Sequence, residues 1–128
     1  YVQFDPPEWP LMKDNHFTHN HPRGTWGVSG PDVGFAMTHD LAEIRAVTPL
    51  RISRLLRPAG GWNAVFWQLV VGPVFNQIDG VVYTEFTAAI ANGTMSQAVA
   101  DRLHNHEVWT RVAKALGLDY RSDPFHTP

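Results

Sequence analysis

The chain has 128 residues, of which 44% are hydrophobic, which is enough for one domain with a core and too few to argue for two. Its formal net charge of −2, without a block of like charge, argues against nucleic acid as a partner. The lack of cysteine excludes disulfides and thiolate ligands. Because no stretch approaches roughly eighteen uninterrupted apolar residues, we expect neither a membrane partner nor a signal peptide.

Short strands and one helix are predicted for the first part of the chain. Residues 1–4 and 15–21 are expected to be strands, and residues 43–56, with alternating and β-branched side chains, a further strand. Residues 31–41 between them are expected to form a helix. The apolar face of that helix consists of Val33, Ala36, Met37 and Leu41.

A linker and a longer apolar run follow. Proline and paired glycine at residues 57–61 predict a turn or short linker. Residues 62–71 are apolar nearly all round, and we expect a buried helix there rather than a buried strand. Gly72 and Pro73 are expected to kink or break this helix.

The C-terminal half is predicted to be mostly helical. Residues 81–91 are expected to be helical and to end at the cap Asn92-Gly93. The last helix is expected to begin at a capping box over residues 94–97 and to stop at Gly117. Its apolar positions are Val99, Leu103, Val112 and Leu116. Residues 120–128 are polar and contain proline, and we expect a tail.

Four residues with the chemistry of a metal site follow the strand expected at residues 15–21. They are His19, His21, Ser29 and Asp32, in the pattern H-x-H, seven residues, S, two residues, D. Because side chains alternate along a strand, both imidazoles project to the same side. Proline at the start of the following helix places Asp32 in its first turn. Two imidazoles and one carboxylate suit Zn²⁺, with the fourth tetrahedral position left for water, so the pattern predicts the site of a zinc-dependent hydrolase.

The same residues also have a purely structural interpretation. Ser29 and Asp32 precede an apolar run and resemble a helix capping arrangement, in which the serine accepts from backbone N–H groups. His19 and His21 alone are compatible with ordinary surface histidines. It is the joint spacing of the four residues that favours metal binding.

The motif resembles that of a known family. Residues 18–22, Thr-His-Asn-His-Pro, together with the gap and Ser29-x-x-Asp32, are similar to the JAMM (MPN+) zinc metalloproteases and closest to their RadC-like bacterial and phage branch. Residues 40–58 look like JAMM domains attached to phage head-morphogenesis proteins and polymorphic toxins. The resemblance implies an α/β fold, with a small JAMM-like (cytidine-deaminase-like) sheet flanked by helices and a helical C-terminal half.

The resemblance also implies a role for each motif residue. His19, His21 and Asp32 would bind Zn²⁺, and Ser29 would help to stabilise the tetrahedral intermediate. The implied activity is hydrolysis of a peptide or isopeptide bond, in a peptide or protein substrate, through a metal-activated water. We place such a protein in the cytoplasm or in a phage-associated setting.

The general base of this family is a glutamate upstream of the histidine pair. Only eighteen residues precede His19, and Glu8 is the sole glutamate among them. The base is therefore Glu8, Glu107 brought near by the fold, or a glutamate outside this chain. If the base is missing, the alternative is a catalytically weak or inactive binding or assembly module, phage-related and stabilised by metal. A zinc deaminase is disfavoured because its cysteine ligands are absent.

We expect one domain over residues 1–128. It would consist of a metal-site core at 1–60, a helical part at 61–119 and a tail at 120–128. Trp26 is expected either to shape a substrate groove or to cover the edge of the core.

Four further histidines could support the site or the fold. His104 and His106 lie two apart on a predicted helix, about 200° from one another, so they are expected at the helix surface or an interface rather than on one ion. His16 and His39 flank the motif as possible partners of the ligands, with local polar packing as the expected role.

Overall fold

The computed structural model describes residues 13–20, 26–49 and 51–124. The elements in chain order are β1 (His16–Asn20), α1 (Gly30–Thr38), β2 (Glu43–Val47), β3 (Arg51–Leu56), α2 (Ala64–Phe66), the π-helical turn η2 (Trp67–Val71), α3 (Gly72–Ala91), α4 (Gln97–Leu116) and β4 (Tyr120–Pro124). The expected mixed α/β class with a helical C-terminal half is confirmed. The strand expected at residues 1–4 lies outside the described residues.

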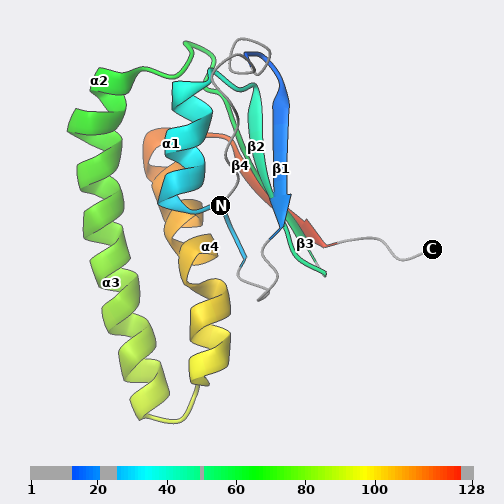
Figure 1. Ribbon diagram of the computed structural model, residues 1–128. Coiled ribbons are helices and arrows are strands. Elements are labelled where there is room, and N and C mark those ends of the chain that lie inside the picture. Colours follow the sequence, from blue (N-terminus) through cyan, green and yellow to red (C-terminus); the bar gives the residue numbers. More distant parts are fainter. Residues whose placement is uncertain (1–12, 21–25, 50, 125–128) are drawn as a thin grey trace.

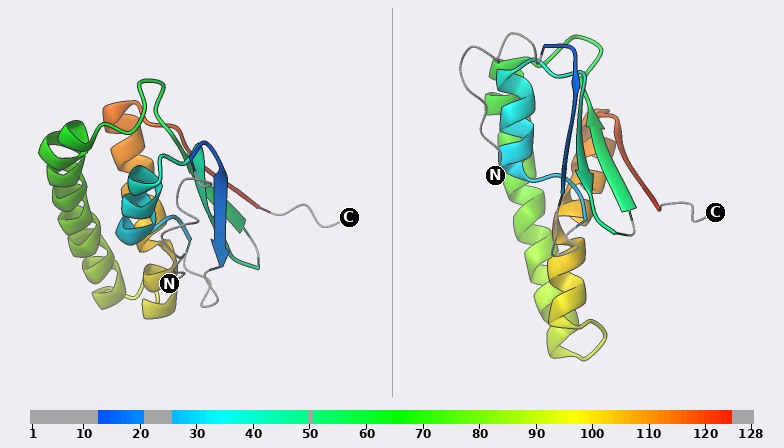
Figure 2. Two further views of the ribbon diagram at one scale, coloured as in Figure 1. Left: turned by 45° about the horizontal axis from the view of Figure 1, so that its top comes forward. Right: turned by 45° about the vertical axis from the view of Figure 1, so that its right-hand side comes forward.

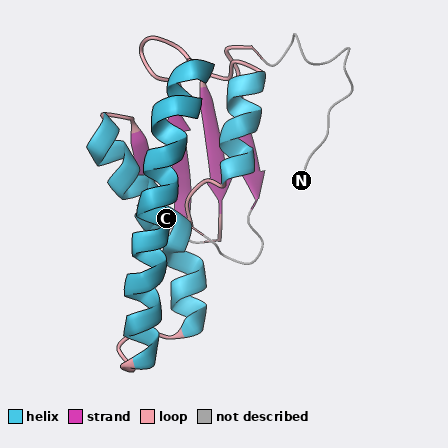
Figure 3. Ribbon diagram, turned by 90° about the vertical axis from the view of Figure 1, so that its left-hand side faces the viewer, coloured by secondary structure: helices cyan, strands magenta, loops and turns pink. Residues whose placement is uncertain are grey.

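The four described strands form one sheet in the order β1-β2-β3-β4. Strands β2, β3 and β4 are antiparallel neighbours, and β1 pairs in parallel with β2 at the edge. The helices lie on one face of the sheet, and α3 is the helix farthest from it (Figure 1). The hairpin of α3 and α4 extends beyond the end of the sheet, as Figures 2 and 3 also show. The fold is therefore a small mixed sheet covered on one side by helices.

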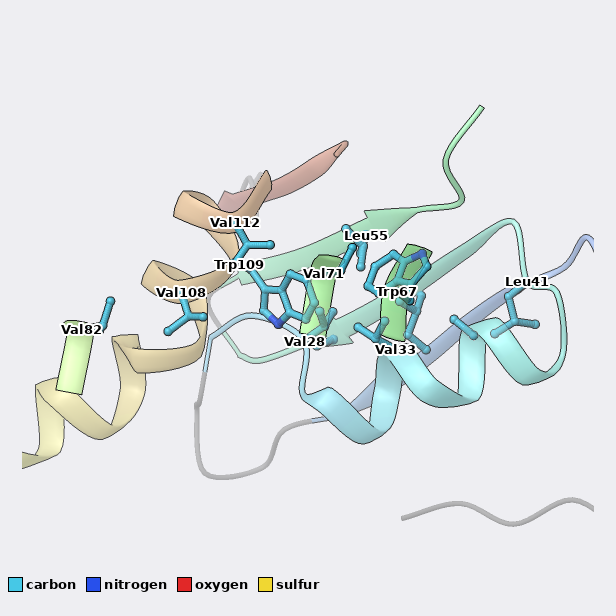
Figure 4. Close-up of a cluster of buried hydrophobic side chains, with 13 residues drawn as sticks. Val28, Val33, Leu41, Leu55, Trp67, Val71, Val82, Val108, Trp109 and Val112 are labelled. Atoms are coloured by element: carbon cyan, nitrogen blue, oxygen red, sulfur yellow. The ribbon is translucent and has the colours of Figure 1, made fainter. Parts of the chain in front are cut away.

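The hydrophobic core lies between the sheet and the helices (Figure 4). It joins side chains of α1, β2 and β3 to Trp67 and Val71 of η2 and to Val108 and Trp109 of α4. The residues expected on the buried face of α1 are largely confirmed, because Val33, Ala36 and Leu41 are buried and Met37 packs at the margin. The helix itself ends at Thr38, three residues before the expected end.

The single strand expected at residues 43–56 is instead two strands. A tight turn between β2 and β3 joins them, and in it the backbone N–H of Thr48 donates to the carbonyl of Arg51 at 2.9 Å. The N–H of Arg51 donates to Thr48 Oγ1 at 3.0 Å. Pro49 lies inside this turn and has no N–H to give to a ladder. The expectation of one strand was wrong because β-branched residues on both sides of the turn concealed it.

The tail expected at residues 120–128 is wrong over its first five residues, which form β4. This strand pairs with β3, with Ser122 opposite Ser53 and Tyr120 opposite Leu55. Its polar side chains have partners in the fold: Ser122 Oγ lies 3.0 Å from Ser53 Oγ and accepts from Arg51 Nε at 3.1 Å. A polar segment thus becomes a strand because its partners come from elsewhere in the chain.

The apolar run expected to be a buried helix at residues 62–71 is helical from Ala64, but the expected burial holds on one side only, because Val65 and Leu69 are 63% and 68% exposed. Trp67 and Val71 reach the core, and Trp62 Nε1 donates to the carbonyl of Leu41 at 2.7 Å. Gly72 and Pro73 do not break the helix. The π-helical turn η2 ends just before them, and the N–H of its C-cap, Gly72, donates to the carbonyl of Trp67. This π-helical turn shifts the hydrogen-bond pattern immediately before Pro73, which lacks an N–H.

The segment Ala64–Ala91 is long and apolar enough to cross a membrane by length and composition. It contributes Trp67, Val71 and Val82 to the core, but only 17% of its most apolar window is buried, whereas the core helix of a soluble protein is mostly buried. The expectation that this chain has no membrane partner stays a prediction.

Helix α4 begins two residues later than expected. Its N-cap is Ser96, whose side chain accepts from the N–H of Val99 at 3.2 Å. Thr94, the expected cap, instead belongs to the end of α3, where its hydroxyl lies 2.6 Å from Asn92 Oδ1 and donates to the carbonyl of Ala89. Gly117 ends α4 with a left-handed φ of 70°, as its position predicted.

Candidate functional site

The start of α1 holds two of the four motif residues in a capping box. Ser29 is the N-cap, and its hydroxyl accepts from the backbone N–H of Asp32 at 3.2 Å. In return the N–H of Ser29 donates to Asp32 Oδ2 at 2.9 Å. Asp32 is only 6% exposed. The structural interpretation of these two residues is therefore confirmed, and the carboxylate also lies at the positive end of the helix.

The capping box does not preclude a ligand role for Asp32. A carboxylate has two oxygens and about four acceptor positions, so a carboxylate that accepts a capping hydrogen bond can also bind a metal. The N–H of Ser29 fixes the plane of the carboxylate, which is what hydrogen bonds to metal-binding carboxylates do. Ser29 Oγ accepts from Asp32 and keeps its own proton, so it can still donate to a substrate oxygen.

The predicted histidine ligands come from the edge strand of the sheet. His19 lies in β1 opposite Ala46 of β2, which confirms its expected place in a strand. His21 lies outside the described residues. Among the described side chains no group of three His, Asp or Glu residues is placed to hold a metal ion. Because neither His21 nor the side chain of His19 belongs to the described part, the predicted triad stays a prediction.

Of the two glutamates that the sequence offers as the base, the structure describes Glu107. Glu107, a candidate base from the sequence, lies on α4 and accepts from Arg111 Nε at 2.9 Å, four residues along the same helix. Glu8 lies outside the described residues. The base therefore stays unassigned among Glu8, Glu107 and a glutamate outside this chain.

Glu43 is a buried acid that the sequence did not single out. It is 3% exposed, accepts from Arg45 Nη2 at 3.0 Å and lies 3.7 Å from Arg54 Nε. It stands three residues before Ala46, about 10 Å along β2 and on the opposite face of the sheet. We therefore assign Glu43 to the outer face of the sheet and not to the motif. In the sequence, Glu43 could have been recognised as the only acidic residue of the strand Glu43–Val47.

Three other described histidines, His39, His104 and His106, have local partners. His39 caps the far end of α1, about 10 Å from Asp32 along the axis, and its ring lies 4.4 Å from that of Phe35. His104 Nε2 lies 2.6 Å from Asp79 Oδ1 of α3. His106 Nδ1 lies 2.8 Å from the hydroxyl of Tyr120 in β4. His104 and His106 therefore face different neighbours, as their spacing predicted.

The segment that enters α1 is attached closely to α4 and β3. The N–H of Trp26 donates to the carbonyl of Arg102 at 2.8 Å, and that of Gly27 donates to Ser53 Oγ at 3.1 Å. The indole of Trp26 lies edge-on to His106, with ring centroids 5.9 Å apart. Trp26 thus packs at the edge of the core, beside the residues that lead to Ser29.

A separate apolar cavity of about 460 Å³ lies between α1 and the helix formed by η2 and α3. Gly30 borders it next to Ser29, and the rings of Trp67 and Trp109 form part of its wall. Within the described part of the chain, neither indole N–H has a hydrogen-bond partner. The cavity contains none of the motif side chains, so its chemistry differs from that of the motif.

Comparison of the chain with protein-family models, with curated proteins and with solved structures finds no match.

Proposed function

We propose that this chain is a zinc-dependent hydrolase that cleaves a peptide or isopeptide bond. His19, His21 and Asp32 would hold Zn²⁺, and Ser29 would act on the substrate side. The observation that carries the proposal is the buried carboxylate of Asp32 in the first turn of α1, at the spacing from the histidine pair that the metalloprotease motif requires.

The donor set fits zinc. Imidazole nitrogen and carboxylate oxygen are both common zinc ligands, and three protein ligands leave one open position. Asp32 is already oriented by the N–H of Ser29 on a regular helix, so little conformational freedom would be lost on binding. When bound, Zn²⁺ would lower the pKa of a water molecule toward about 7 and polarise the scissile carbonyl.

The chain's own residues would then position charge and protons. The hydroxyl of Ser29 accepts from the N–H of Asp32, which orients it and leaves its proton to donate to the developing oxyanion. A carboxylate must take the proton of the attacking water. Glu107 is engaged with Arg111, so we assign this step to Glu8 or to a glutamate outside this chain.

A second candidate is a binding or assembly module in which the metal only stabilises the fold. The complete capping box favours it, because Ser29 and Asp32 already have a structural role without catalysis. The two candidates differ in one respect. The hydrolase needs a carboxylate in reach of the open coordination position, and the module does not.

Metal content measured on matched variants tests the zinc proposal. Elemental analysis of the protein is expected to find about one zinc per chain. His21→Ala is expected to lose zinc, whereas His39→Ala is expected to keep it, because His39 caps the far end of α1 and packs on Phe35. Metal-free protein, or equal zinc content in the two variants, would refute the ligand assignment.

Ser29→Ala separates the hydrolase from the module. Both candidates predict that it loses about 1 kcal/mol of stability with the cap and keeps its zinc. Only the hydrolase predicts a fall in kcat, about 10²-fold or more for loss of an oxyanion donor, against peptide and isopeptide substrates. A zinc-loaded protein that cleaves neither linkage, with a glutamate-bearing upstream segment present, would favour the module.

A further inference from the structure

A polar pocket of about 430 Å³ lies between α4 and the β3–β4 edge of the sheet. We call it the Arg51 pocket. Its polar lining residues are Arg51, His106, Thr110, Lys114, Tyr120 and Ser122. No aspartate or glutamate is among the described residues that line it. The pocket therefore offers two positive charges and several hydroxyl groups, with no negative charge in its wall.

The guanidinium group of Arg51 is held in a fixed orientation. Its Nε donates to Ser122 Oγ at 3.1 Å, and its Nη2 donates to the carbonyl of Ser122 at 2.9 Å. Its central carbon lies 4.4 Å from the centroid of the Trp26 ring, which is a cation–π contact. A guanidinium has five N–H donors, so these two bonds leave others for a ligand.

Arg51 differs from most other described arginines in lacking an acidic partner. Ion pairs with a carboxylate are made by Arg45, Arg54, Arg57, Arg111 and Arg121. Arg51 is half-buried, yet in the part of the chain that the structure describes no carboxylate forms an ion pair with it. Partial burial of a charge is unfavourable unless an opposite charge or several hydrogen bonds compensate it. A bound anion would supply that charge.

The neighbouring ionisable groups do not supply it. Burial raises the pKa of Tyr120 to about 12, so its phenol keeps the proton at neutral pH. Burial and the charge of Arg51 lower the pKa of His106, although Glu107 opposes them, so that imidazole is neutral as well. Lys114 in the last turn of α4 adds the second positive charge. At neutral pH the pocket therefore keeps a positive potential.

We propose that the Arg51 pocket binds an oxyanion, a carboxylate or a phosphate group, which accepts hydrogen bonds from the guanidinium of Arg51. Arginine suits both groups because its planar fork presents parallel donors to two oxygens. Lys114 adds attraction from the rim. The proposal does not depend on zinc binding, because none of the pocket residues belongs to the metal motif.

Titration of the protein with simple anions tests the proposal. The ¹⁵N-labelled protein is titrated with inorganic phosphate and, separately, with acetate, in the presence of a chelator and at constant ionic strength. Saturable shifts are expected at the backbone N–H groups of Thr110 and Ser122 and at the Nε–H of Arg51. A response to phosphate alone would identify a phosphate-bearing ligand, and a response to acetate would identify a carboxylate.

Variants of matched arginines separate a built site from general charge. Arg51→Gln is expected to weaken binding about 10- to 100-fold, as loss of a charge-assisted hydrogen bond predicts. Arg102→Gln is the control, because Arg102 is an exposed arginine of α4 outside the pocket, and it is expected to leave the affinity unchanged. If Arg51→Gln unfolds, Lys114→Gln is expected to keep the fold and to weaken binding about 2- to 5-fold.

Three results would overturn the proposal. The first is that neither anion produces a saturable shift at Thr110 and Ser122. The second is that Arg102→Gln weakens binding as much as Arg51→Gln does. In the third, the shifts centre on Ser29 and Asp32, which would place the anion at the start of α1 instead.

Discussion

Substitution of Gly27 by alanine would separate the segment entering α1 from α4. Gly27 has a φ of +87°, a conformation that side chains disfavour, and it lies against the backbone of α4. An added Cβ would lie 2.8 Å from the N of His106, 3.0 Å from its Cα and 3.1 Å from the carbonyl carbon of Asn105. These are backbone atoms of a regular helix, so the segment itself must move.

The cost has two parts. Holding alanine at positive φ costs about 1–2 kcal/mol, partly offset by about 0.4–1 kcal/mol because alanine reduces the freedom of the unfolded chain. The movement also breaks the bonds from Trp26 N–H to Arg102 and from Gly27 N–H to Ser53 Oγ. Each is worth about 0.5–1.5 kcal/mol. We therefore expect Gly27→Ala to lower the free energy of unfolding by about 2–4 kcal/mol.

Gly61→Ala is the matched control. Gly61 has a φ of +84°, nearly the same as Gly27, and nothing lies within 4 Å of its added Cβ. It should therefore lose only the conformational part, about 0–1.5 kcal/mol. The free energies come from urea unfolding followed by circular dichroism, with the slope compared between variants. If Gly27→Ala costs no more than Gly61→Ala, the close approach of this segment to α4 is wrong.

Three further predictions concern ionisation and capping. The phenol of Tyr120 should ionise near pH 12, so a late step in the ultraviolet absorbance of tyrosinate should vanish in Tyr120→Phe. His106 should titrate below about 6.5 by NMR. Because the unfolded chain then binds more protons than the folded chain, the free energy of unfolding should decrease as pH falls through about 6.5. A titration midpoint of His106 above that value would contradict its burial beside Arg51. Ser96→Ala should destabilise the protein by about 1 kcal/mol and Thr94→Ala by less, since Ser96 caps α4, and the reverse order would restore Thr94 as the cap.

The local sequence pattern was sufficient to predict an element where the residues that stabilise that element lie within it or next to it. The helix α1 could be predicted because Pro31 starts it and its apolar residues recur at helical spacing. The pair Ser29 and Asp32 also belongs here, since a capping box involves only residues three apart. The opposite orientations of His104 and His106 follow from the helical repeat alone.

Contacts between distant segments decided the rest. The strand β4 has no apolar alternation, and it forms because Arg51 and Ser53 bond to Ser122, about seventy residues away along the chain. The Arg51 pocket has no sequence motif for the same reason, because β3, α4 and β4 each contribute to it. Local propensity acts over a few residues, whereas burial and long-range hydrogen bonds exist only once the chain has folded. The sequence by itself therefore determined which segments are helical but not all of their ends, together with the strand of His19 and the cap at Ser29. Only the tertiary structure decided the β2–β3 turn, the strand β4 and the position of Arg51 in the pocket.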